Sequence, residues 1–270
     1  MKLHDNKQAF RDLIIITSNY YGLNPSIVEK DYYVTLILKE ASKEIPGILF
    51  RGGTCLSKCF KIIKRFSEDI DLTLNNSHFT LSNKRNANYS IMAICDKLGL
   101  NIFEKEKILS RRHYNCYNIE YPYSFLNNEL KSYIKLELTF IQKSYPDLIK
   151  QANSLIGNYL EESNQNEVIS MYELEPFDIK VQSLERTFVD KVFALCDYYL
   201  ENRPLRQSRH IYDIYKLTNS IDLSNLNVLI NEVRKERQPN KNCPSAQSNI
   251  SISSILNEII DSNYCELPRT

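Results

Sequence analysis

The sequence has little that would assign it to a special class of proteins. Only six glycines and nine prolines occur among 270 residues, which excludes a low-complexity composition. Neither sign of charge dominates, because 34 basic residues stand against 33 acidic ones, and a net charge of +1 indicates no partner by itself. No apolar run approaches the ~20 residues of a membrane helix, and the charged first 22 residues do not read as a signal peptide. We expect a cytoplasmic protein with no membrane partner and one large or two modest domains.

The cysteines do not form a recognisable metal-binding or disulfide pattern. There are seven of them, an odd number, and no CxxC pair is present. Without an export signal, this usage predicts reduced thiols and no disulfides. Cys55 and Cys59 are four residues apart, but no Cys or His pair with zinc spacing accompanies them. We therefore interpret both as small core residues.

The hydrophobic pattern divides the chain into an α/β (α+β) part over residues 1–180 and a mostly helical part over 181–270. In the second part, helical spacing begins near Gln182 and continues through "SRHIYDIYKLTNS". In the first part, helix and strand patterns are mixed. The patterns predict helices over 6–21, 25–44 and 54–65, and strands at 48–50, at 69–74, within 114–125 and within 132–141.

Two aspartates stand one residue apart in the segment "RFSEDIDLTL" (65–74). In a strand, residues i and i+2 point to the same side, so Asp69 and Asp71 present two carboxylates while Ile70 and Leu72 face the core. Such a pair suits Mg²⁺, with Mn²⁺ as the alternative, because Mg²⁺ takes one or two protein carboxylates and completes its coordination with water and substrate phosphates. The other interpretation is an exposed strand edge with two solvated aspartates.

A pair of glycines precedes this strand. Gly52 and Gly53 form a predicted turn between the strand at 48–50 and a helix that begins at Thr54. Backbone N–H groups at such a turn can bind phosphate, the helix dipole favours an anion, and glycine lets the backbone approach closely. A turn without a ligand would use glycine for conformation alone. Basic residues without an acidic one between positions 51 and 65 indicate a local anion site.

Glu137 in "YIKLELTF" is the candidate for a third carboxylate. Lys135, Glu137 and Thr139 share one face of the predicted strand, and Leu136 and Leu138 share the other. A two-metal site would use Glu137 as a further metal ligand. The alternative is a pair between Lys135 and Glu137 on a solvated face of the sheet.

A Gly-Gly turn and helix, then Asp-x-Asp and a later acidic strand residue, resemble the nucleotidyltransferase superfamily related to DNA polymerase β. The spacing from Gly53 to Asp69 is somewhat longer than is common in that superfamily. Five ordered segments are more specific, and they resemble the AbiEii toxin family, the nucleotidyltransferase-like toxins of bacterial type IV toxin–antitoxin and abortive-infection systems, which include the MenT toxins. The segments are "EKDYYV" (29–34), "FRGGTCLSKCF" (50–60), "RFSEDIDL" (65–72), "ERTFVDKVFAL" (185–195) and "RHIYDIYKL" (209–217).

The resemblance implies a polymerase β-like domain with a mixed sheet, a helical second domain, and transfer of a nucleotide from an NTP with release of pyrophosphate. By motif position, Ser67 lies beside the metal-binding aspartates, Lys191 contacts the triphosphate and Asp213 completes the active site. An ammonium near the leaving pyrophosphate would neutralise its developing charge. The candidate residues are Asp69, Asp71, Lys191 and Asp213 for catalysis, Gly52, Gly53, Thr54, Ser67 and Lys191 for nucleotide and phosphate, and Asp69, Asp71 and Glu137 for metal.

One position departs from the family pattern. The family usually has Arg-Asp before Tyr-Asp, whereas this chain has Arg209 and His210. His210 is then either a general base or a histidine on the helix surface. Without the family, Asp213 would read as an i, i+4 partner of Arg209 on an exposed helix. Lys191 would read as a lysine that extends past the apolar stripe at Phe188.

The resemblance also implies an acceptor and a partner protein. Studied members of the family add nucleotides to the 3′ end of tRNA, which blocks translation, so we expect tRNA or another RNA as acceptor. Basic stretches at 58–65, 111–114 and 203–209 could follow an RNA backbone, with tyrosines stacking on unpaired bases, or could be solvated faces. A cognate AbiEi-like antitoxin is implied. The alternatives are transfer to a protein hydroxyl and a non-catalytic nucleotide-binding module that acts through a partner.

Overall fold

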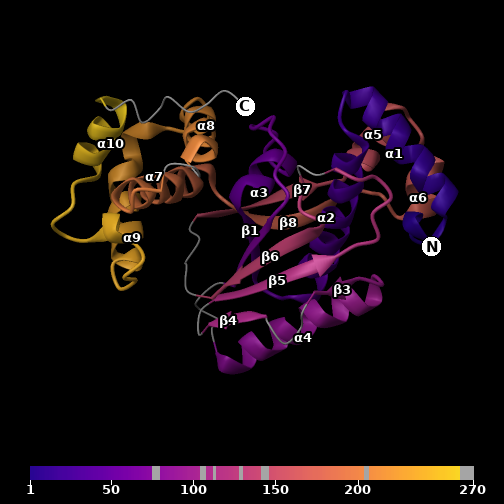
Figure 1. Cartoon of the computed structure of the whole chain (residues 1–270), viewed down its shortest axis with the longest axis horizontal. Coiled ribbons are helices and arrows are strands. Elements are labelled where there is room, and N and C mark those ends of the chain that lie inside the picture. Colours follow the sequence, from indigo (N-terminus) through magenta and orange to yellow (C-terminus); the bar gives the residue numbers. More distant parts are fainter. Residues whose placement is uncertain are drawn as a thin grey trace. The chain divides into compact units, whose positions relative to one another are not determined.

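The computed structural model describes residues 1–74, 80–103, 108–111, 114–127, 130–140, 146–203 and 207–261. The chain divides into two compact units (Figure 1). The first unit consists of Met1–Gln142 and Asp147–Val181, and the second consists of Lys143–Pro146 and Gln182–Thr270. The first contains a mixed sheet with helices and the second is helical, so the predicted fold class is confirmed.

The first unit begins with helices whose ends follow the sequence signals. Gly22 ends α1 in the left-handed conformation, with φ of 64°, and the Asn24 side chain accepts from the backbone N–H of Ser26 at the start of α2. Pro25 occupies the first position of α2. The helices of this unit are the 3₁₀ helix Leu3–Asp5, α1 Lys7–Tyr21, α2 Pro25–Glu44, α3 Gly52–Lys58, α4 Leu81–Lys97, α5 Leu155–Glu162 and α6 Asn166–Tyr172.

The strands form one mixed sheet. They are β1 Ile48–Arg51, β2 Ile70–Leu74, β3 Asn101–Ile102, β4 Leu109–Arg111, β5 Tyr114–Glu120, β6 Tyr133–Thr139, β7 Asp147–Ala152 and β8 Phe177–Gln182. Among the described residues the order is β3-β5-β6-β2-β1-β8-β7, with β4 paired to β5. β2 is antiparallel to β1 and parallel to β6, so it lies inside the sheet with hydrogen-bonded neighbours on both sides.

Alternation along β2 and β6 separates an apolar face of the sheet from a polar one. Ile70, Leu72, Leu136 and Leu138 are all fully buried, and they belong to one cluster with apolar side chains of α2 and α4. The residues that alternate with them along the strands point to the opposite face. Asp71 and Glu137 are half-buried there, and Thr73 is buried. The prediction that Ile70 and Leu72 face the core is confirmed.

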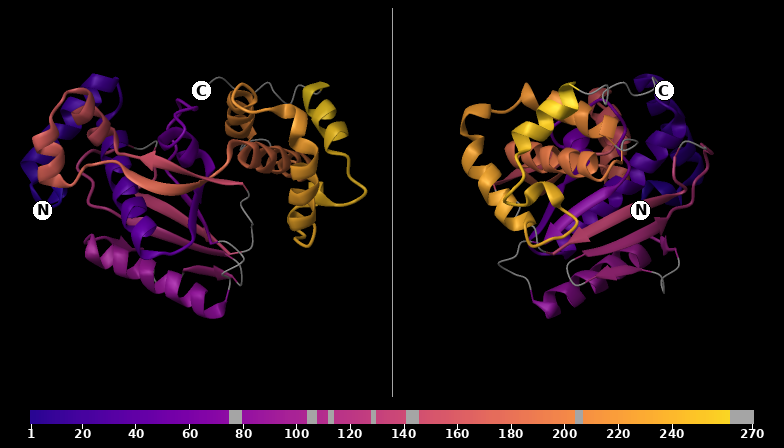
Figure 2. Two further views of the ribbon diagram at one scale, coloured as in Figure 1. Left: turned by 180° about the vertical axis from the view of Figure 1, so that it is seen from behind. Right: turned by 60° about the vertical axis from the view of Figure 1, so that its left-hand side comes forward.

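The second unit is built around α7 (Figure 2). Ser183 caps α7 by accepting from the backbone N–H of Arg186. Helices α8, α9 and α10 all contact α7, and two apolar clusters fill the space between them. The helices of this unit are α7 Leu184–Leu200, α8 Gln207–Thr218, the 3₁₀ helix Leu223–Asn225, α9 Leu226–Arg237, the 3₁₀ helix Pro244–Ala246 and α10 Ile252–Asp261.

Buried ion pairs connect the helices of the second unit. Arg186 Nη2 lies 2.7 Å from Glu236 Oε2, and Arg237 Nη2 lies 2.8 Å from Asp197 Oδ2. Ser245 donates from its hydroxyl to Asp197 Oδ1 at 2.6 Å. Since each buried charge has an oppositely charged partner, the cost of removing it from water is offset. No helix in the part of the chain that the structure describes is long and apolar enough to cross a bilayer.

The helix predicted over 54–65 is wrong in its extent. α3 ends at Lys58, and Lys61 has φ of 55°, a left-handed conformation that an α-helix cannot continue through. The backbone N–H of Ile62 instead donates to the carbonyl of Leu56 at 3.1 Å. The predicted Gly-Gly turn is itself the first turn of α3. The basic stretches at 111–114 and 203–209 lie partly outside the described residues, at 112–113 and 204–206.

Candidate active site

A row of polar residues crosses the middle of the sheet in the first unit. In the register, the Cα of Asp71 on β2 pairs with that of Arg51 on β1 and with that of Glu137 on β6. Glu137 in turn pairs with Cys116 on β5. Because paired residues on adjacent strands point to the same face, Asp71 and Glu137 lie side by side although they are far apart in sequence.

Asp69 precedes the first residue of β2, and its side chain is 35% exposed. Asp71 is half-buried. Since Ile70 between them is fully buried against the core, both aspartates turn to the polar face of the sheet. The structure thus brings two of the three predicted metal ligands, Asp69 and Asp71, together at the start of β2.

The two glycines lie directly against these side chains. Gly52 has φ of 79°, which favours glycine, and a Cβ at this position would overlap the carboxylate of Asp71. A Cβ on Gly53 would lie 2.8 Å from both Arg65 Nη2 and Ser67 Oγ. The absence of side chains at both positions therefore keeps the α3 backbone in contact with the segment that carries the aspartates.

Thr54 connects the start of α3 to the same segment. It is almost fully buried, its hydroxyl donates to the carbonyl oxygen of Asp69 at 2.5 Å, and its Oγ1 lies 3.0 Å from Ser67 Oγ. The structure therefore gathers six of the predicted site residues around one point of the first unit. They are Gly52, Gly53, Thr54, Ser67, Asp69 and Asp71.

Lysine side chains contact the carboxylates of Asp69 and Glu137. Lys131 Nζ lies 3.1 Å from Asp69 Oδ1, and Lys135 forms an ion pair with Glu137 two residues along β6. Burial works to lower the pKa of Lys135, but the hydrogen bond and the charge of Glu137 outweigh it and raise this pKa above its ordinary value. The Lys135–Glu137 pair that the sequence offered as an alternative is present.

Three consecutive charged residues of α2, Glu29, Lys30 and Asp31, begin the segment "EKDYYV" and hold parts of the first unit in place. The sequence alone gave them no role. Lys30 is fully buried, forms an ion pair with Glu68 next to Asp69, and donates to the carbonyl of Lys131 at 2.7 Å. Burial lowers the pKa of Lys30, against the opposing effect of Glu68. Consecutive charges in an otherwise apolar helix were the available signal, because such charges are buried only with partners.

The neighbours of Lys30 hold other segments in place. Asp31 lies 2.5 Å from Lys58 Nζ at the end of α3 and accepts from the backbone N–H of Leu155 at 2.7 Å. Lys58 also donates to Thr35 Oγ1 at 2.7 Å. Through Asp31, α2 fixes the orientation of α3 and therefore of the two glycines at its start.

The remaining predicted residues belong to the second unit and contact each other. Lys191 Nζ on α7 lies 2.8 Å from Asp213 Oδ2 on α8. Asp213 is fully buried, so the exposed helix position that the sequence allowed as an alternative is wrong. His210 is half-buried with its ring 5.4 Å from that of Tyr198, which differs from a freely exposed surface histidine.

The donor set fits a magnesium ion that carries ligands from solvent and substrate. Within the described residues, no group of three or more His, Cys, Asp or Glu side chains is placed to hold a metal. Asp69 and Asp71 alone supply two carboxylates, the share that Mg²⁺ ordinarily takes from a protein. A Cβ on Gly52 would overlap the Asp71 carboxylate, so a metal held by Asp71 would lie close to the backbone at the start of α3.

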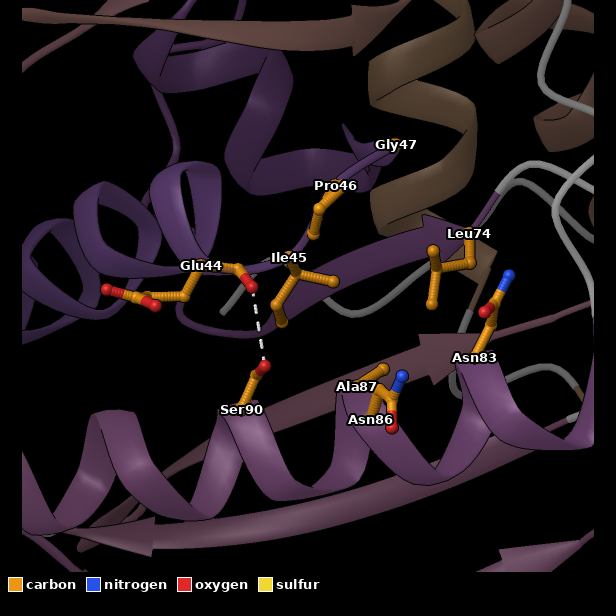
Figure 3. Close-up of a pocket in the computed structure, with 9 residues that line it drawn as sticks. All are labelled: Glu44, Ile45, Pro46, Gly47, Leu74, Asn83, Asn86, Ala87 and Ser90. Atoms are coloured by element: carbon orange, nitrogen blue, oxygen red, sulfur yellow. Dashed lines mark hydrogen bonds between the residues drawn. The ribbon is translucent and has the colours of Figure 1, made fainter.

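A hollow of about 250 Å³ lies at the other end of β1 and β2, away from Asp71 (Figure 3). Ile45 and Leu74 face Ala87 of α4 across it, and Ser90 donates to the carbonyl of Glu44 at 3.3 Å. Glu44 is the only acidic residue among those that line it in the described part of the chain. It therefore offers no paired carboxylates and is not a candidate for the same chemistry.

The sequence matches a known protein family. A family model described as "Nucleotidyl transferase AbiEii toxin, Type IV TA system" matches residues 36–266. The chain belongs to the AbiEii family. The resemblance predicted from five short segments is therefore confirmed. No curated protein matches this AbiEii chain.

Among solved structures, the AbiEii chain is similar to MenT4, a nucleotidyltransferase toxin from Mycobacterium tuberculosis H37Rv. The two share 13% sequence identity with a TM-score of 0.43. The alignment covers 68% of this chain and 59% of the MenT4 chain.

Proposed function

We propose that the protein is a Mg²⁺-dependent toxin that transfers a nucleotide from an NTP to the 3′ end of an RNA, preferably tRNA, in the cytoplasm. One observation carries this proposal: Gly52, in the backbone segment suited to phosphate, lies directly against the carboxylate of Asp71. Substrate phosphate and the metal that binds it must meet at one point in nucleotidyl transfer, and this contact provides such a point.

The reaction is an in-line displacement. The 3′-hydroxyl oxygen of the acceptor bonds to the α-phosphorus of the NTP, the bond from that phosphorus to the bridging oxygen of the β-phosphate breaks, and pyrophosphate leaves. The hydroxyl proton is released to solvent. Mg²⁺, when bound, would lower the pKa of the attacking hydroxyl and stabilise the departing oxygen.

Each residue has a separate task in this proposal. Asp69 and Asp71 would hold the metal, and the lack of a side chain at Gly52 and Gly53 lets the α3 backbone, whose N–H groups would bind phosphate, lie against Asp71 and Ser67. Ser67 offers a hydroxyl in the same place, and Arg65 brings a guanidinium near Gly53. These groups position the triphosphate, and positioning supplies much of the rate in phosphoryl transfer.

The family resemblance supplies two further residues, Lys191 and Asp213. Lys191 would bind the triphosphate, and Asp213, which lies 2.8 Å from it, would hold its ammonium in a fixed orientation. The family description supports the wider role, because it places these transferases in toxin–antitoxin systems. We accordingly propose an AbiEi-like antitoxin as the partner protein.

The test is to incubate the purified protein with Mg²⁺, total bacterial tRNA and each α-labelled NTP in turn. Asp71→Asn removes one metal-binding charge at nearly constant volume, and Asp96→Asn, at an exposed aspartate of α4, is the matched control. We expect label in tRNA with the wild type and Asp96→Asn, and loss of labelling with Asp71→Asn. Label only in protein, or labelling that Asp71→Asn leaves intact, would contradict the proposal.

A further inference from the structure

A cavity of about 310 Å³ opens in the first unit between α2 and the segment that leads into β6. Tyr121, Tyr123 and Phe125 line it with aromatic surface, and Lys131 lines it as well. Tyr123 is 47% exposed, whereas Tyr121 is only 8% exposed. The cavity is thus an aromatic pocket in which Tyr123 is the most exposed of the three rings, and its volume falls in the range of small-molecule sites.

The segment that carries the aromatic residues, 121–125, is held in place by hydrogen bonds and ring contacts. Glu29 on α2 is fully buried and accepts from the backbone N–H groups of Ser124 at 2.7 Å and Phe125 at 3.1 Å. The ring of Tyr121 lies 5.1 Å from that of Tyr33, and the Arg11 guanidinium lies 5.1 Å from the Phe125 ring. A buried carboxylate that binds two backbone amides preorganises the segment above it, as a binding site requires.

Lys131 links this pocket to the aspartates. It lines the cavity, and its ammonium lies 3.1 Å from Asp69 Oδ1. The backbone carbonyl oxygen of Asp69 accepts a hydrogen bond from the hydroxyl of Thr54 at the start of α3. Asp69 therefore lies between the glycines, where the donor phosphates would bind, and the aromatic pocket.

We propose that the aromatic pocket binds the unpaired 3′-terminal base of the acceptor RNA. This inference rests on the proposed function, because it takes the two sides of Asp69 as the donor and acceptor sides of the reaction. Tyr123 would stack on the base, since aromatic rings bind unpaired bases of any identity in this way. Asn127, whose Nδ2 donates to Ser26 Oγ at 3.2 Å, adds polar groups at the rim.

The experiment measures RNA binding apart from catalysis. A short fluorescein-labelled single-stranded RNA that ends in CCA is titrated with the full chain, without NTP, and binding is followed by fluorescence anisotropy. Tyr123→Ala removes the ring and Tyr123→Phe keeps it. Tyr89→Ala is the matched control, because Tyr89 is also an exposed tyrosine of the first unit, 69% exposed, and lies on α4. KM values for tRNA and for NTP are measured for the same variants.

Loss of the ring at position 123 should weaken RNA binding by roughly five- to a hundred-fold, the effect of one base stack. The affinity of Tyr123→Phe for the RNA should be within about two-fold of the wild-type affinity. The affinity of Tyr89→Ala should equal that of the wild type. Tyr123→Ala should also raise KM for tRNA and leave KM for NTP unchanged. Equal RNA binding by Tyr123→Ala and Tyr89→Ala would overturn the inference.

Two further outcomes separate this inference from the proposed function. If Tyr123→Ala raises KM for NTP but not for tRNA, the pocket holds the donor base, and the assignment to the acceptor is wrong while nucleotidyl transfer stands. If RNA binding depends on Tyr123 but no NTP labels the RNA, the pocket is supported and the proposed reaction fails.

Discussion

Lys191 Nζ on α7 and Asp213 Oδ2 on α8 lie 2.8 Å apart, and both side chains are buried within the helical unit. The family resemblance implies a separate task for each residue, contact with the triphosphate for Lys191 and completion of the active site for Asp213. Their pairing means that replacement of Asp213 alone leaves the buried Lys191 ammonium without this carboxylate.

Replacement of Asp213 alone should destabilise the second unit. Asp213→Ala leaves the Lys191 ammonium buried, and we expect the free energy of unfolding to fall by about 3 kcal/mol, measured by urea denaturation. The double variant Lys191→Met/Asp213→Leu should recover much of this loss but not the transfer activity. Arg209→Ala, at an exposed residue of the same helix, should change stability by less than about 0.5 kcal/mol. Activity in the stable double variant would show that the pair is purely structural.

Gly52→Ala should abolish nucleotidyl transfer because its Cβ would overlap the Asp71 carboxylate. Gly22→Ala is a close control, since Gly22 has a similar φ of 64° with nothing within 4 Å of an added Cβ. Both variants should lose about 1 kcal/mol of stability from left-handed strain, with a further loss for Gly52→Ala. Only Gly52→Ala should lose activity, and equal activity in the two variants would contradict the role of the contact.

Two lysines of the same basic stretch should respond differently to substitution. Lys58→Met breaks a buried pair with Asp31 and should lower the free energy of unfolding by about 3 kcal/mol. Lys61→Met, at an exposed position, should have little effect on it. Chemical denaturation of the two variants side by side measures the difference. Similar stabilities would mean that Lys58 does not anchor α3.

The thiols of Cys59 and Cys116 should react at different pH. The hydrogen bond with Cys55 lowers the pKa of Cys59, aided by Lys58 and opposed by burial, whereas burial raises the pKa of Cys116. Because only the thiolate reacts, alkylation of Cys59 by iodoacetamide should begin at lower pH than that of Cys116. Mass spectrometry of peptides after brief labelling across a pH series measures both, and the reverse order would contradict the assigned environments.

Several local features were predictable because they depend on neighbouring residues alone. Gly22 and Pro25 mark helix ends through their fixed backbone preferences, and the alternation through Ile70 and Leu72 gives the buried face of β2. The helix over 54–65 was overextended because its apolar spacing continues while Lys61 adopts a left-handed conformation. Apolar spacing reports burial, and Ile63 is indeed buried outside any helix.

By itself, the sequence determined the family, the two kinds of structure in the chain, and the residue types and spacing of Gly52, Gly53, Asp69 and Asp71. Only the tertiary structure decided which distant residues meet. The pairing of β6 with β2 sets Glu137 beside Asp71. The physical reason is that strand order and helix packing depend on the burial of the whole chain, whereas spacing reports only local geometry.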